Sequence, residues 1–156
     1  MKTKFMGADH PSTALSVVSV GEQLRKLGKH EEAMRQFDQA LETWKAKVGE
    51  DHPWNAYAHL GVGQIALAEQ RPADAITAFE RAVAVQEGAA VQGQDLGEAR
   101  FLLAKSLHLA ERDHERALEL AKKAKGDYRN QEDGAKYVAE IDEWLAKATS
   151  IGAATP

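Results

Sequence analysis

The sequence contains no cysteine, and this absence excludes several kinds of chemistry. Without thiols the chain forms no disulfide, has no thiolate nucleophile and offers no zinc site with cysteine ligands. No apolar run approaches the roughly 18 residues that a transmembrane helix needs. The lysines near the amino terminus are not followed by the apolar stretch of a signal peptide. We therefore expect a cytoplasmic protein that does not use a membrane as its partner.

The chain also lacks an excess of positive charge. Its 20 Lys and Arg residues are outnumbered by 24 Asp and Glu residues, for a net charge of −4. Proteins that bind nucleic acid directly need a basic surface that displaces counterions from the phosphates. We expect no direct nucleic-acid ligand. With 44% hydrophobic and 28% charged residues, the composition is that of a folded globular domain.

Motifs of catalysis and metal binding are missing as well. The sequence has neither a Gly-x-Ser-x-Gly elbow nor a Gly-x-x-x-x-Gly-Lys phosphate loop. His30, followed by two glutamates, has no second histidine at the spacing of a helical zinc site. The neighbouring side chains of Asp113, His114 and Glu115 point apart on a turn, and His59 and His108 suit half-buried imidazoles better than ligands. We expect no enzymatic activity, no metal and no cofactor.

A block near the start of the chain recurs 42 positions later. Gly7-Ala8-Asp9-His10-Pro11 returns as Gly49-Glu50-Asp51-His52-Pro53. Four further positions keep this register, namely Gly21 and Gly63, Ala33 and Ala75, Phe37 and Phe79, and Ala40 and Ala82. The pattern Ala-x-x-x-Phe-x-x-Ala places small residues and one ring on a single stripe of a helix. Such a period predicts stacked helix pairs.

The Gly, Ala and Phe positions of the two repeats resemble those of the tetratricopeptide repeat, a helix-turn-helix unit. The longer period and the Asp-His-Pro junction are similar to the variant found in kinesin light chains and many bacterial signalling proteins. The resemblance implies an all-α fold, a right-handed α-α superhelix of three helix pairs plus a C-terminal capping helix. It also implies a module that binds other proteins.

The first two repeats are predicted at about residues 7–48 and 49–91. In the first, helices cover about 11–27 and a segment that begins with His30 as N-cap and is stopped by Gly49. In the second, Asp51 is expected to cap the first helix. Pro72 begins the second helix, which continues to about residue 87.

The third repeat, at about residues 92–129, is predicted to open on a capping box of Asp95 and Glu98. Its second helix keeps the offset of 42 from the previous repeat, whereas its first helix fits better at 43, as if one turn residue were missing. A capping helix is expected at about 130–149, with one apolar face and one charged face. The domain then covers 1–150, and residues 150–156 form a frayed tail.

The Asp-His-Pro junction normally joins one repeat to the next, yet here it follows directly on the first six residues. This position favours a piece of a longer chain, or the last three repeats of a larger array. A short free-standing protein is the alternative.

In the family, the concave groove of the stack is lined by one face of the first helices of the pairs. The resemblance implies a peptide-binding groove of Leu15, Val18, Glu22, Arg25, Tyr57, Leu60, Gln64, Leu67, Leu102, Ser106 and Leu109. The Lys and Asn clamp with which some members bind a terminal carboxylate is absent, since Val18, Glu22, Leu60 and Gln64 occupy those places. An apolar groove suits an amphipathic helix or an apolar peptide anchor.

Two alternatives apply to these positions. The leucines of the groove can instead belong to the core or to a neighbouring repeat. Trp54, at a helix start, is either an exposed anchor for a partner or packs on the second helix of the first repeat.

The segments 99–104, 116–121 and 140–145 look similar to the C-terminal repeat regions of large bacterial serine/threonine protein kinases. No kinase motif occurs in this chain. The resemblance therefore implies a scaffold, as an accessory part of a signalling protein. Two other hypotheses are a self-association module that forms a homodimer, and the interaction domain of a transcriptional or stress-response regulator.

Overall fold

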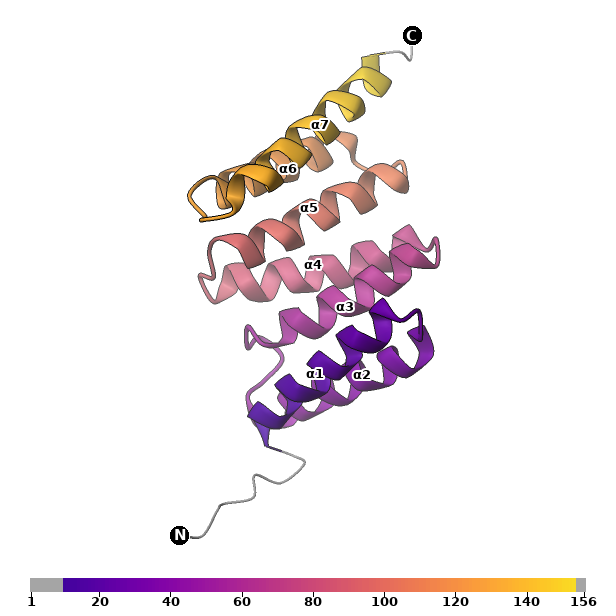
Figure 1. Cartoon of the computed structure of the whole chain (residues 1–156), viewed down its shortest axis with the longest axis vertical. Coiled ribbons are helices and arrows are strands. Elements are labelled where there is room, and N and C mark those ends of the chain that lie inside the picture. Colours follow the sequence, from indigo (N-terminus) through magenta and orange to yellow (C-terminus); the bar gives the residue numbers. More distant parts are fainter. Residues whose placement is uncertain (1–9, 154–156) are drawn as a thin grey trace.

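The computed structural model describes residues 10–153, which form a stack of antiparallel helix pairs (Figure 1). Within this range there are seven helices: α1 (Pro11–Lys26), α2 (His30–Lys47), α3 (Asn55–Ala68), α4 (Pro72–Gly88), α5 (Gln94–Leu109), α6 (His114–Arg129) and α7 (Gly134–Ala153). Helices α1 and α2, α3 and α4, and α5 and α6 pack as pairs, and α7 packs on α6. The predicted all-α fold of three helix pairs and a terminal helix is confirmed for this part of the chain. None of these helices is long and apolar enough to cross a membrane.

The recurring glycine and phenylalanine positions pack against one another. The buried ring of Phe37 lies against Gly21 of α1 and Gly61 of α3, and Phe79 lies against Gly63. A Cβ atom added at Gly63 would lie 2.5 Å from Cε1 of Phe79, too close for any real contact. The 42-residue period therefore records a packing rule, in which a missing side chain on one helix makes room for a ring on the next.

The third pair follows the same plan with a shifted register. The buried positions Ala56, Ala58, Leu60, Gly61 and Gly63 of α3 correspond, at an offset of 43, to Ala99, Phe101, Leu103, Ala104 and Ser106 of α5. In the second helix, Ala121 takes the place of Phe79 at an offset of 42. Beyond these positions α3 continues to Ala68, whereas α5 ends at Leu109. The third repeat is thus shortened at the end of its first helix. The sequence had suggested a missing residue in the turn, and the turn is not shorter.

Three helix starts differ from the predictions. Asp51 does not cap α3, which begins at Asn55; the side-chain amide of Asn55 instead donates to the carbonyl oxygens of Gly49 and His52, each at 2.9 Å. Asp95 and Glu98 form no capping box, because α5 begins at Gln94 and its N-cap is a glycine. His30 is the first residue of α2 and not its cap.

The C-terminal helix is displaced from its predicted position. Gly134 begins α7 because residues 130–133 form a turn, in which the amide of Gly134 donates to the carbonyl oxygen of Gln131. The helix then continues to Ala153, so that residues 150–153, which were expected in the tail, are helical. Residues 1–9, with the start of the first junction, and residues 154–156 of the predicted tail lie outside the described part.

Apolar and aromatic contacts hold α7 on the last pair. Ile141 is fully buried, and the ring of Trp144 meets the edge of Phe101 at a centroid distance of 5.7 Å. Tyr137 stacks on Tyr128 at 4.6 Å. Most of the remaining α7 side chains are exposed, as expected of a helix that covers the end of a stack.

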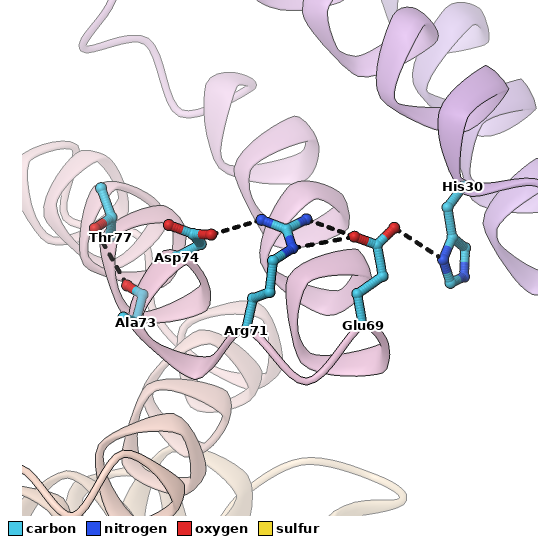
Figure 2. A network of polar contacts seen from close by, with 6 residues as sticks. All are labelled: His30, Glu69, Arg71, Ala73, Asp74 and Thr77. Atoms are coloured by element: carbon cyan, nitrogen blue, oxygen red, sulfur yellow. Dashed lines mark hydrogen bonds and ion pairs between the residues drawn. The ribbon is translucent and has the colours of Figure 1, made fainter.

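Polar contacts join successive repeats. Figure 2 shows Glu69 between His30 at the start of α2 and Arg71 at the start of α4; its carboxylate lies 3.3 Å from the His30 Nδ1 and 2.7 Å from an Arg71 nitrogen. Arg71 also pairs with Asp74 at 2.6 Å. The hydrogen bond from Arg71 lowers the pKa of Glu69. Because these side chains are solvated, the network orients the turn more than it stabilises the fold.

Candidate functional site

A groove of about 420 Å³ runs across helices α1, α3 and the first turns of α5. Its lining residues are Leu15, Val18, Ser19, Glu22, Gln23, Tyr57, Leu60, Gln64 and Glu98. The α1 and α3 residues recur three or four positions apart, which is the spacing of one helix face. Two consecutive repeats therefore present equivalent faces to the same cavity.

The floor of the groove is apolar, and the side chain of Tyr57 in the groove is well exposed. Val18 and Leu60 are buried and close the bottom, and Leu15 is half-buried beside them. Tyr57 keeps 41% of its surface accessible. An accessible ring above buried aliphatic side chains is the kind of surface on which a partner's apolar residue can be desolvated.

The polar groups of the groove are two amides, two hydroxyls and two carboxylates. Glu22 is engaged within α1, where Arg25 donates from Nη2 to Oε2 at 2.9 Å and from Nε to Oε1 at 3.2 Å. Glu98 has no such partner among the described residues. Burial raises the pKa of Glu98, and the nearby carboxylates of Asp95 and Glu22 raise it further.

Six of the predicted groove residues line this cavity, namely Leu15, Val18, Glu22, Tyr57, Leu60 and Gln64. Arg25 lies beside it through its pair with Glu22. Leu67 and Leu102 pack in part against the hydrophobic core, which matches the alternative interpretation for them. Leu109, 63% exposed, lies outside the groove at the end of α5.

Ser106 was wrongly predicted to face a ligand. Its side chain is fully buried, and its hydroxyl donates to the carbonyl oxygen of Leu102 at 2.8 Å. The offset of 43 explains the error, because Ser106 corresponds to the packing position Gly63 and not to Gln64.

The sequence prediction missed Ser19, Gln23 and Glu98. Ser19 and Gln23 follow Val18 and Glu22 on the helix, so a wider face would have included them. Glu98 had been assigned to a capping box, and that assignment concealed its place in the groove. The 42-residue register gave no signal for Glu98, because the first helix of the third repeat does not keep that register.

Trp54 is a packing residue and not a free anchor. Its ring lies 6.2 Å from that of the buried Trp44 on α2 and 4.7 Å from the imidazole of His52. The indole Nε1 of Trp44 donates to the carbonyl oxygen of Pro11 at 3.0 Å. The aromatic cluster thus joins the first pair to the start of the second, as one of the two interpretations had it.

The histidines of the described residues are not grouped as metal ligands. Within the described residues, no group of three His, Asp or Glu side chains is placed to hold a metal ion. Burial and the nearby Arg81 lower the pKa of His59 to about 4, so its imidazole is neutral at pH 7. His108 packs its ring against Trp144 at 5.5 Å.

Comparison with protein families gives one finding that bears on this groove. Residues 12–88 match a family model described as tetratricopeptide repeat. A comparison with curated proteins gave no match. The matched segment contains α1 to α4 and so most of the groove, and repeats of this family generally mediate contacts between proteins without being catalytic. The match covers just under half of the chain, and it shows that the segment 12–88 is similar to tetratricopeptide repeats.

Proposed function

We propose that the chain is a protein-binding scaffold, and that the groove across α1, α3 and α5 receives a segment of the partner. The observation that carries the proposal is the apolar floor of Val18 and Leu60 beneath an accessible tyrosine, built from equivalent positions of two consecutive repeats. The cavity is an open groove that is large enough for a few side chains of a partner.

The groove favours an amphipathic helix or an extended segment with an apolar anchor. Its floor offers apolar contacts to one face of a ligand, and its polar side chains lie where the other face begins. We therefore expect a protein or peptide partner, with neither nucleic acid nor a membrane in direct contact.

Affinity capture from lysate of the source cells, followed by mass spectrometry, tests this proposal. The bait is the wild-type chain beside Tyr57→Arg, which places a charge on the exposed part of the groove, and Leu109→Arg, which makes the same change at an exposed site outside it. We expect a partner that the wild type and Leu109→Arg retain and Tyr57→Arg loses. Equal recovery by all three baits would contradict binding in the groove.

Self-association is the second candidate function. Val20 on α1 and Leu27, the C-cap residue of this helix, are 51% and 72% exposed and give the end of the helix an apolar outer edge. A second copy that covers this edge would produce a homodimer. Sedimentation velocity over a range of concentrations distinguishes the two: a mass that doubles in the wild type but not in Leu27→Arg favours the dimer.

The cellular setting belongs to the proposal as well. The resemblance of segments 99–104, 116–121 and 140–145 to repeat regions of bacterial serine/threonine kinases supports an accessory module of a bacterial signalling protein in the cytoplasm. An interaction domain of a transcriptional or stress regulator is the alternative. The partner recovered by affinity capture would decide between them.

A further inference from the structure

We infer that the groove selects a partner segment in which a lysine or arginine lies beside the apolar anchor, and that this cation pairs with Glu98. The inference rests on the proposed function, since it names the chemistry of the ligand for the same groove.

The placement of Glu98 is the first argument. Its side chain is half-buried and lines the groove together with Tyr57, Leu60 and Gln64 of α3. In the described part of the chain it makes no hydrogen bond and no ion pair through its side chain. A carboxylate in this position has lost part of its hydration without gaining a protein partner, which is unfavourable.

Its surroundings are the second argument. Burial is the largest cause that raises the pKa of Glu98; Asp95 and Glu22 add to it, and Arg25 and Lys105 only partly oppose it. Arg25 is already engaged by Glu22, and the Lys105 ammonium lies 4.6 Å above the ring of Phe101. Neither cation neutralises Glu98, so the groove keeps an unpaired negative charge.

Two other half-buried charged side chains of this chain, Arg100 and Glu22, are ion-paired. Arg100, also on α5, pairs with Asp127 at 2.7 Å and with Glu87 at 3.0 Å. Glu22 is paired with Arg25. Glu98 departs from this pattern beside the apolar groove that it lines, and a ligand cation would complete the pair.

The expected ligand follows from these positions. An apolar side chain would enter between Tyr57 and Leu60, and an ammonium or guanidinium group would reach the Glu98 carboxylate to form a charge-assisted hydrogen bond. On a helical ligand the two groups would be three or four residues apart. An acidic ligand would meet Glu98, Glu22 and Asp95 and be repelled.

Selection from a random peptide library displayed on phage tests the inference without a known partner. The targets are the wild-type chain, Glu98→Gln and Tyr57→Ala, with Glu119→Gln on the exposed face of α6 as the matched control for the loss of one carboxylate. The most enriched peptide is then synthesised, and its dissociation constant for each protein is measured by fluorescence anisotropy.

We expect enriched peptides that combine an apolar residue with Lys or Arg, bound roughly ten-fold more weakly by Glu98→Gln and unchanged by Glu119→Gln. Enriched peptides that need Tyr57 but carry no cation, or bind Glu98→Gln equally well, would overturn this inference and leave the proposed function standing. If no enriched peptide depends on Tyr57, the proposed function fails, and the inference fails with it.

Discussion

Gly61 is the described glycine that an aromatic ring approaches most closely. Its missing side chain admits the ring of Phe37 from the preceding repeat, so the position couples two helix pairs. Helix propensity alone would favour alanine here by about 1 kcal/mol. The close approach of the ring reverses that preference.

We predict that Gly61→Ala lowers the free energy of unfolding by about 1 to 3 kcal/mol, because the added methyl group forces the Phe37 ring or the backbone to move. The control is Gly126→Ala in α6, where a Cβ would meet nothing within 4 Å. That variant should be unchanged or more stable by up to about 1 kcal/mol. Urea denaturation measures both, and equal effects of the two substitutions would contradict the packing account.

His59 makes stability depend on pH. Its pKa is about 4 in the folded chain and 6.5 in the unfolded one, so the unfolded chain binds the proton more readily between these values. The contribution of neutral His59 is complete above about pH 6.5 and is lost toward pH 4, at a cost of about 2 to 3 kcal/mol.

The measurement compares urea denaturation at pH 7 and pH 4.5 for the wild type and His59→Gln. We expect the variant to lose less stability between the two pH values than the wild type does. His114→Gln, at the exposed start of α6, should retain the wild-type difference. A wild-type pH dependence in His59→Gln would show that other groups cause it.

At the scale of elements, the helices could be predicted far better than their ends. The apolar period of Ala33, Phe37 and Ala40 identifies α2 because burial of that face determines the helix. The start of α3 depends on the side-chain amide of Asn55, which closes the junction where an aspartate cap was expected. Helix starts depend on a few hydrogen bonds between neighbours, and several residues of the junction can form them equally well.

The terminal helix α7 is expected to stabilise the stack by covering the last helix pair. Trp144 is half-buried and meets Phe101 and His108 on α5 with nearly perpendicular rings. We predict that Trp144→Ala lowers the free energy of unfolding by about 2 to 4 kcal/mol, because it uncovers the last pair and leaves a cavity. Lys147→Ala, exposed on the same helix, should change it by less than about 0.5 kcal/mol. A Trp144→Ala variant as stable as the wild type in urea would show that the stack does not need this contact.

At the scale of the whole molecule, the repeat register predicted six of the nine residues that line the groove. Equivalent positions on α1 and α3 could be carried from one repeat to the next because the 42-residue period is unbroken there. The same register gave a wrong prediction at Ser106 in the third repeat, because α5 keeps an offset of 43 from α3 whereas α6 keeps an offset of 42 from α4. Glu98 could not be found by register at all, because its role depends on which helix lies beside α3 in space.

Glu98 also links stability to function. Because burial raises its pKa, the ionised carboxylate destabilises the folded chain at neutral pH, and this cost diminishes as the pH falls. We predict that Glu98→Gln has a higher melting temperature at pH 7 than the wild type, and that the difference shrinks toward pH 5. A lower melting temperature for the variant would show that Glu98 is already satisfied within the fold.

The central claim is that α1, α3 and the start of α5 form one binding surface. The most direct test is to titrate the isotopically labelled chain with the enriched peptide and follow its backbone amides by NMR. The account predicts that the largest shift changes lie around Val18, Leu60 and Glu98. Changes concentrated on α2, α4 and α6, or on α7, would place binding on another face and contradict it.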